Sequence, residues 1–139
     1  MKKFNFRLQK VLEYRQMLQQ WAKEAYLDAR SSRLEAELSL HQITSLRLEV
    51  LTWRSNTIES RQTIEMQLRK LDQKEVEQRL IVNVLVHEEE LALNAWKEKK
   101  IELEALNKMY DKQFGEWQLD MDRKLQNELD EWATRKRVA

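Results

Sequence analysis

The chain contains no cysteine, no proline and a single glycine, Gly115, in 139 residues. A fold with several loops needs residues that permit positive φ or fix a turn, so this chain can reverse direction only rarely. The lack of cysteine excludes disulfides and fits the cytosol. No run of about 18 apolar residues is present, so we expect no membrane-spanning segment. Arg7 and Lys10 interrupt the apolar stretch that a secretion signal needs, so secretion is not expected.

Charged residues are abundant and nearly balanced in sign. They make up 35% of the chain, against 42% hydrophobic and 8% aromatic residues. This profile is typical of a coiled coil or an extended helical hairpin. Lys and Arg number 25 and Asp and Glu 24, for a formal net charge of +1. The balance argues against nucleic acid as the main partner.

A heptad pattern runs through the first third of the chain. Seam residues at alternating spacings of three and four predict one helix with a coiled-coil seam. The predicted seam positions are Leu8, Val11, Arg15, Leu18, Ala22, Ala25, Ala29, Ser32, Ala36, Ser39, Ile43, Leu46, Val50 and Trp53. Because the residues from Ala22 to Ser39 are small, this helix needs a partner with larger side chains.

The periodicity falters across residues 51–63, where Thr, Ser and Asn cluster. These side chains compete for backbone hydrogen bonds and favour turns and caps, so we place a reversal at about residues 55–61. The pattern then resumes along a second helix. Its predicted seam positions are Ile64, Leu68, Leu71, Glu75, Gln78, Val82, Leu85, Glu89, Ala92, Trp96, Lys99, Leu103, Leu106 and Tyr110.

Folding the chain back on itself brings small residues of the first seam opposite large residues of the second. Residue i then faces roughly residue 117 minus i, which places Ala22 and Ala25 at the level of Trp96 and makes Trp96 a core residue. This complementarity favours an intramolecular hairpin over a parallel homodimer. The predicted fold is all-α, a long two-helix antiparallel coiled-coil hairpin forming one domain, 1–139, with helices at about 4–54 and 62–136.

The second predicted helix is longer than the first and leaves an overhang from about residue 118. Apolar residues continue there at nearly helical period. They are Phe114, Trp117, Met121, Leu125, Leu129 and Trp132. Such a stripe is unfavourable in water, so this end either self-associates or frays, or it is held by another protein.

No catalytic or ligand-binding constellation is present in the sequence. His41 and His87 lack metal-ligand spacing. The isolated Gly115 cannot form a phosphate-binding loop. Acidic pairs such as Glu88 and Glu89 are expected on an exposed helix, where nothing excludes water as acid or base catalysis requires. We expect no enzymatic activity, no cofactor and no metal.

Three stretches together resemble one family. "FNFRLQKVLEYR" at 4–15, "LALNAWKEKKIELEAL" at 91–106 and "ELDEWATRKR" at 128–137 are similar to the opening, late and closing segments of the FliJ family. This resemblance implies a cytoplasmic stalk protein of the flagellar type III export apparatus, peripheral to the inner membrane at the flagellar base. It implies a hairpin like the central stalk subunit of rotary ATPases, and three partners: the hexameric export ATPase FliI, the export gate protein FlhA and export chaperones.

The resemblance also implies two binding surfaces. For the ATPase, at the terminal end, it implies Phe4, Arg7, Phe114, Trp117, Met121, Leu125, Leu129 and Trp132. For the gate, at the hairpin tip, it implies Gln42, Leu46, Trp53, Leu71 and Gln78. Leu46 and Leu71 are also predicted seam residues. The resemblance also implies an aromatic residue in some relatives at the position of Glu49, and another near the position of Gln67.

A monomeric rod is the expected state under this interpretation. The alternatives are the equivalent stalk protein of a virulence type III secretion system and a self-associating structural coiled coil.

Overall fold

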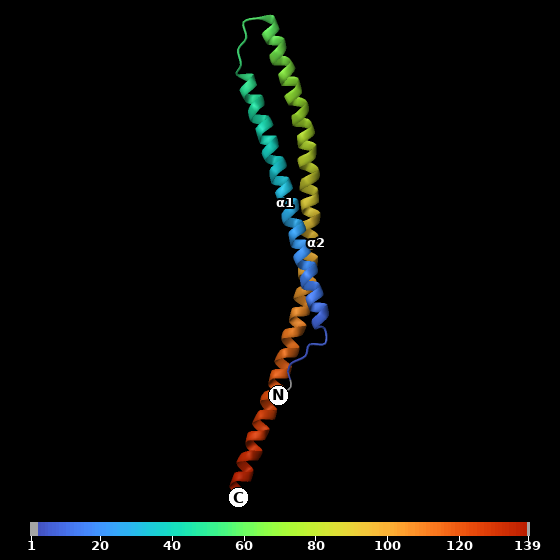
Figure 1. Ribbon diagram of the computed structural model, residues 1–139, viewed down its shortest axis with the longest axis vertical. Helices are drawn as coiled ribbons and strands as arrows, with labels where there is room; N and C mark the ends of the chain where they lie inside the picture. Colours follow the sequence, from blue (N-terminus) through green and yellow to red (C-terminus); the bar gives the residue numbers. More distant parts are fainter. Residues whose placement is uncertain (1–2, 139) are drawn as a thin grey trace. The chain divides into compact units, whose positions relative to one another are not determined.

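The computed structural model describes residues 3–138, and within this range it consists of two α-helices joined by a short loop (Figure 1). The first, α1 (Gln9–Leu51), has 43 residues, and the second, α2 (Ile58–Val138), has 81. The predicted all-α two-helix hairpin is therefore confirmed. Residues 1, 2 and 139 of the predicted domain lie outside the described range.

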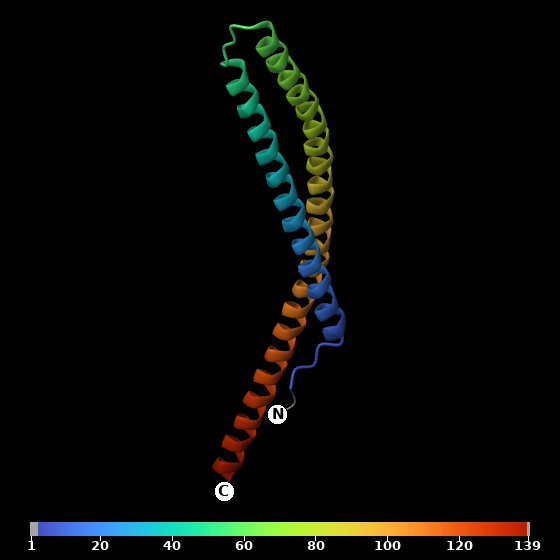
Figure 2. The same cartoon turned by 45° about the horizontal axis from the view of Figure 1, so that its top comes forward.

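The helices contribute to two compact units. One unit contains the chain from Trp21 to Lys97, and the other combines the residues up to Gln20 with those from Glu98 onward. In the Trp21–Lys97 unit, α1 and α2 lie side by side and run antiparallel, as Figures 1 and 2 both show.

The reversal lies slightly earlier than the sequence pattern indicated. The loop occupies residues 52–57, so α1 ends before residue 54 and α2 begins before residue 62. Thr57 explains the early start of α2, because its hydroxyl oxygen accepts a hydrogen bond from the Ser60 backbone N–H at 3.2 Å. This is an N-cap. At the other side, the Thr52 hydroxyl donates to the Glu49 carbonyl at 2.6 Å and closes the last turn of α1.

The predicted seam of the second helix is confirmed along its whole length. All fourteen predicted positions from Ile64 to Tyr110 are buried or half-buried, and Leu71, only 5% exposed, is the most deeply buried of them. Charged and polar members such as Glu75 and Gln78 are included. The spacing of three and four residues therefore located this stripe correctly even where the residues are not apolar.

The predicted seam of the first helix is wrong at every second position along most of its length. Val11, Ala25, Ser32, Ser39, Leu46 and Trp53 are exposed. The observed stripe repeats strictly by four and three residues. It consists of Leu8, Leu12, Arg15, Gln19, Ala22, Tyr26, Ala29, Arg33, Ala36, Leu40, Ile43, Arg47 and Val50.

Long side chains explain this displacement. An arginine can bury its aliphatic stem in a seam while its guanidinium reaches a carboxylate at the edge. Arg15 does so with Glu102, at an N–O distance of 2.6 Å. The prediction included Arg15 but took Ser32 and Leu46 as seam positions in place of the neighbouring Arg33 and Arg47, which lie in the observed stripe. The Arg15–Glu102 pair nevertheless obeys the predicted register of 117 minus i.

Trp96 lies on the seam, half-buried, as predicted. Its ring does not sit opposite alanines alone. It stacks on the ring of Tyr26, with centroids 5.5 Å apart and planes inclined by 20°. The contact pairs two large side chains, so packing here depends on aromatic stacking as well as on small residues receiving large ones.

We predict that Trp96→Ala lowers the free energy of unfolding by about 2–3 kcal/mol, because it removes the stacking partner of Tyr26 and leaves a gap in the seam. Thermal and urea unfolding followed by circular dichroism at 222 nm would measure the change. Trp21→Ala is the matched control, since Trp21 is 55% exposed and its loss should change stability by less than about 0.5 kcal/mol. Equal losses in both variants would contradict the assignment of Trp96 to the core.

Candidate functional site

The segment before α1 is not helical, and it packs its aromatic side chains on α2. Residues 3–6 form neither helix nor strand, and a turn at residues 7–8 leads into α1 at Gln9. Phe4 and Phe6 both contact Tyr110, with ring centroids 5.4 and 5.3 Å away. Residues two apart point to nearly opposite sides of a helix but to the same side of an extended chain. This packing explains why the helix starts at Gln9 and not near residue 4.

Phe4 is the centre of an aromatic cluster. Besides Tyr110 it contacts Phe114, with centroids 5.3 Å apart and planes at 80°, and Trp117, at 5.8 Å. Phe114 also stacks on Trp117 at 5.8 Å. Edge-to-face and offset-stacked pairs are the favourable arrangements of aromatic rings. The structure thus brings together Phe4, Phe114 and Trp117, three of the residues assigned to ATPase binding. Each of these rings covers part of the surface of the other two.

Two members of this cluster were missing from the predicted site. Phe6 is only 4% exposed, and Tyr110 was predicted as a seam residue alone. The alternation of phenylalanines in "FNF" was the signal available in the sequence, because alternate residues of an extended segment share one face. Arg7, by contrast, lies exposed in the turn before α1.

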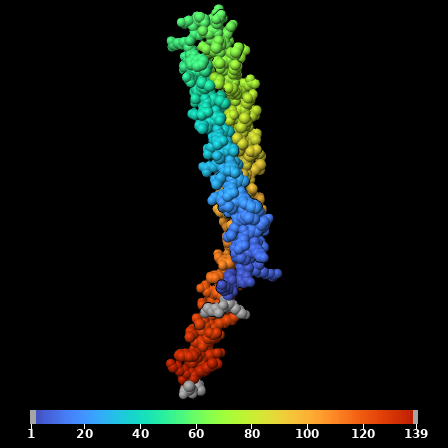
Figure 3. All heavy atoms as spheres, in the orientation of Figure 1, coloured from blue at the N-terminus to red at the C-terminus, as the bar shows by residue number. Residues whose placement is uncertain are grey.

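Beyond Trp117, α2 carries an apolar stripe at its surface. Met121 is half-buried, whereas Leu125, Leu129 and Trp132 are 46, 52 and 62% exposed. Their spacings of four, four and three residues place them on one side of the helix. Figure 3 shows this last part of α2, in red, with its side chains at the surface. We call these four residues the terminal stripe.

The helix end around the terminal stripe is rich in charge of both signs. Arg135, Lys136 and Arg137 occupy the last turn, where cations complement the helix dipole. The Lys136 ammonium lies over the Trp132 ring, 4.9 Å from its centroid. A cation over an aromatic face adds a modest attraction at an exposed site. The stripe therefore ends in an aromatic ring with a basic rim.

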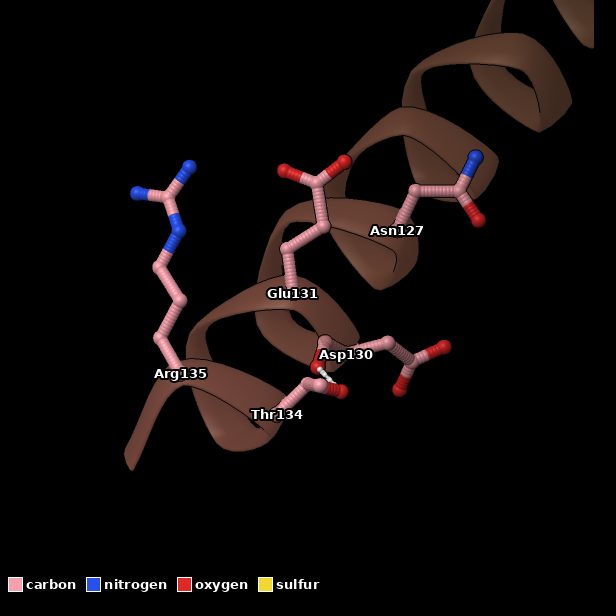
Figure 4. A pocket seen from close by; sticks show the side chains of 5 residues that line it. All are labelled: Asn127, Asp130, Glu131, Thr134 and Arg135. Carbon is pink, nitrogen blue, oxygen red and sulfur yellow. Dashed lines mark hydrogen bonds between the residues drawn. The ribbon is translucent and has the colours of Figure 1, made fainter. Parts of the chain in front are cut away.

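A shallow hollow on the same helix end does not form a small-molecule site. It is lined by Asn127, Asp130, Glu131, Thr134 and Arg135. Figure 4 shows these side chains spreading outward from one helix, with a hydrogen bond from the Thr134 hydroxyl to the Asp130 carbonyl at 2.8 Å. A binding pocket needs concave walls and converging polar groups, and a single exposed helix supplies neither.

In the described part of the chain, no group of three or more His, Cys, Asp or Glu side chains is placed to hold a metal ion. Neither helix, over residues 3–138, has a stretch long and apolar enough to cross a membrane.

The residues assigned to the hairpin tip separate into two kinds. Gln42, Leu46 and Trp53 are exposed, the last two by 46 and 49%. Leu71 is 5% exposed and belongs to the core. The Gln78 side-chain amide donates a hydrogen bond to the Ala36 carbonyl at 3.0 Å. Leu71 and Gln78 therefore hold the two helices together, and the other three side chains remain at the surface.

Trp53 lies in the loop and forms one wall of a hollow there. The other lining residues are Ser55, Arg61, Ile64 and Glu65. An exposed indole next to a hollow is a typical anchor for protein binding, since aromatic residues are enriched at interfaces.

The chain matches a model of a known protein family. The family model described as "Flagellar FliJ protein" matches residues 4–137. No curated protein and no solved structure matches the chain.

We predict that Phe4 and Phe114 stabilise the protein jointly. The losses in unfolding free energy from Phe4→Ala and Phe114→Ala should deviate from additivity by about 0.5–1.5 kcal/mol in the double variant, because each removes the other's edge-to-face partner. Urea unfolding of the four proteins gives the coupling energy. Phe4→Ala combined with Trp132→Ala is the control, and it should be additive within about 0.5 kcal/mol. Additivity in both pairs would refute the coupling.

Proposed function

This chain belongs to the flagellar FliJ family, whose members take part in flagellar protein export, and we propose that it is the stalk of the export apparatus. In this proposal its terminal end inserts into the hexameric export ATPase FliI and promotes assembly and activity of the ring. The protein then also links the ATPase to the export gate protein FlhA and to export chaperones. The match to a flagellar family model favours this role over that of a virulence-secretion stalk.

The terminal stripe is the observation that carries the proposal. Leu125, Leu129 and Trp132 expose about half of their side-chain surface or more, and apolar surface gathered on one side of a helix gains free energy when a partner covers it. When a helix binds in an apolar groove of a partner, residues spaced by three or four positions make the contacts. In this proposal the wall of the ring's pore supplies the apolar surface, and it surrounds the inserted helix.

The aromatic cluster supports this arrangement by holding the base of the stripe. Phe4 packs on Phe114 and Trp117, directly before Met121 in sequence. A docking element that is already ordered loses less conformational entropy on binding. We therefore assign Phe4, Phe114 and Trp117 mainly to ordering this end, and the terminal stripe to contact with the ATPase. Arg7 and the basic last turn would contact acidic groups at the rim.

For the gate we propose a surface formed by Gln42, Leu46 and Trp53. Each is exposed, and Trp53 adjoins the hollow at the loop. The protein acts in the cytoplasm, peripherally at the inner membrane through the gate. It works through binding and supplies no catalytic group.

Replacing two leucines of the terminal stripe tests the ATPase site. Leu125→Glu with Leu129→Glu should weaken binding to the cognate ATPase at least tenfold, because two carboxylates would have to be desolvated in an apolar groove. A pull-down with purified ATPase measures binding, and the rate of ATP hydrolysis measures stimulation. Deleting residues 118–139 should abolish both.

Leu119→Glu is the matched control. Leu119 is 60% exposed, but at 3.6 residues per turn it lies about 120° around α2 from Leu125 and about 80° from Leu129, outside the terminal stripe, so this variant should bind normally. Normal binding and stimulation by the double variant would show that the stripe is not the site. Sedimentation of the unmodified protein at several concentrations distinguishes the alternative, since a self-associating coiled coil would form a dimer or larger oligomer and the proposed stalk a monomer.

Trp53→Ala tests the gate surface. We expect a loss of about 2 kcal/mol in binding to the cytoplasmic part of the gate protein, typical of an interfacial tryptophan, with an unchanged melting temperature. Titration calorimetry measures the affinity. Leu71→Ala should behave in the opposite way, because Leu71 is a core residue. Its melting temperature should be lower, but its affinity for the gate protein, measured at a temperature where the variant is folded, should be unchanged. Unchanged gate binding by Trp53→Ala would exclude the loop from the interface.

A further inference from the structure

Charged side chains occupy seam positions of both helices in the Trp21–Lys97 unit. Arg33 forms an ion pair with Glu89, and Arg47 pairs with Asp72 at 2.7 Å and lies 3.9 Å from Glu75. The side chains of Arg33, Glu89 and Glu75 are only 20, 15 and 13% exposed. Charges this far out of water are retained only when they are paired.

Each pair is completed by a neighbour on its own helix. Glu37 accepts a second hydrogen bond from Arg33 at 2.9 Å, and Arg79 donates to Glu75 at 2.6 Å. The hydrogen bonds of Glu89 and then Glu37 raise the pKa of the Arg33 guanidinium above its usual value. An arginine guanidinium keeps its charge over the pH range in which proteins are folded, so Arg33 needs carboxylate partners wherever it is out of water.

Arg33 with Glu89 forms one layer of charged residues across the seam, and Arg47 with Glu75 forms a second. The distance between the two layers, counted in residues, is the same on both helices. Arg33 and Arg47 are two heptads apart on α1, and Glu75 and Glu89 are two heptads apart on α2. One axial alignment of the helices therefore satisfies both layers at once. We call these four residues the seam charges.

The apolar part of the seam distinguishes poorly between alignments that differ by one heptad. Sliding one helix by seven residues moves every seam position onto another seam position, so much of the same type of surface stays buried. The seam charges respond differently to the slide. Arg33 would face Val82 or Trp96 in place of Glu89, and Arg47 would face Leu68 or Val82 in place of Glu75.

We infer that the seam charges fix the axial register of the helical hairpin, because either alignment slipped by one heptad separates Arg33, which is only 20% exposed, from Glu89 and separates Arg47 from Glu75. Removing one partner of a buried pair is strongly destabilising, even where the pair itself adds little stability over apolar residues. Polar residues at single seam positions are known to specify register in this way. The inference concerns the hairpin alone and does not depend on the proposed function.

Spin labels provide the measurement, and the absence of native cysteine makes labelling clean. Labels at Ser31→Cys and Lys70→Cys, both exposed positions, lie 21 residues apart along the axis in the register that pairs Arg33 with Glu89. At 1.5 Å per residue the axial offset is about 32 Å. A slip that pairs Arg33 with residue 82 reduces the offset by about 10 Å, to about 21 Å. Pulsed dipolar spectroscopy resolves such a change.

The decisive variant moves both glutamates by one heptad without changing composition. It combines Glu89→Val with Val82→Glu, and Glu75→Leu with Leu68→Glu. We expect a population whose label-to-label distance is about 10 Å shorter than in the parent protein. The matched control exchanges Glu77 and Val84, also seven residues apart but exposed, through Glu77→Val with Val84→Glu. It should keep the parent distance.

A relocated variant that remains helical and shows only the parent distance would overturn the inference. If that variant loses its helicity, a second one decides the matter: Arg33→Leu, Arg47→Leu, Glu75→Leu and Glu89→Leu together give an apolar seam that should melt no lower than the parent. With the seam charges gone, we expect two distances about 10 Å apart. A single parent distance in this variant would equally overturn the inference.

Discussion

The packing of two helices along one narrow seam is the constraint on which the rest of this structure depends. Two helices form no third layer, so each can bury only one stripe of side chains. The hydrophobic residues that are buried in the described part of the chain are Phe6, Leu12, Ala36, Val50 and Leu71, and none of them is completely out of contact with water. Stability must therefore come from many half-buried contacts spread along the helices. This is why stacking of Tyr26 on Trp96 and of Phe4 on Tyr110 matters more here than it would in a thick core.

A narrow seam also explains how arginine and glutamate can serve as packing residues. Every seam position lies close to the solvent-exposed edge of the two-helix interface. A long charged side chain can therefore bury its aliphatic stem in the seam while its charged group pairs with an opposite charge that is itself partly exposed to water. Arg33 with Glu89, at 20 and 15% exposure, is farther out of water than Arg15 with Glu102, at 37 and 41%, or Arg47 with Asp72, at 40 and 52%. Exposed pairs contribute little to stability. Their drier counterparts discriminate between arrangements of the helices.

The hollows at the helix end and at the loop are shallow, and the features that stand out on the described helices are exposed apolar side chains. The helices differ in length, 43 residues against 81, so a long part of α2 carries apolar residues for which α1 has no counterpart. The loop likewise leaves Trp53 half exposed. For a member of the FliJ family, both features support a role in joining proteins of the export apparatus, with contact surfaces as the working parts.

The sequence by itself determined the two-helix fold, the approximate site of reversal and the whole seam of α2, because scarcity of glycine and proline together with heptad spacing leaves few alternatives. It also pointed to the exposed terminal stripe. Only the tertiary structure decided which face of α1 is buried, since Arg33 or Arg47 is an acceptable seam residue only when Glu89 or Glu75 stands across from it. The same holds for Phe4 and Phe6, whose extended backbone is stabilised by rings more than one hundred residues away in sequence. It also separated Leu71 and Gln78, which hold the helices together, from Leu46 and Trp53, which remain available to a partner, because burial depends on the neighbouring helix.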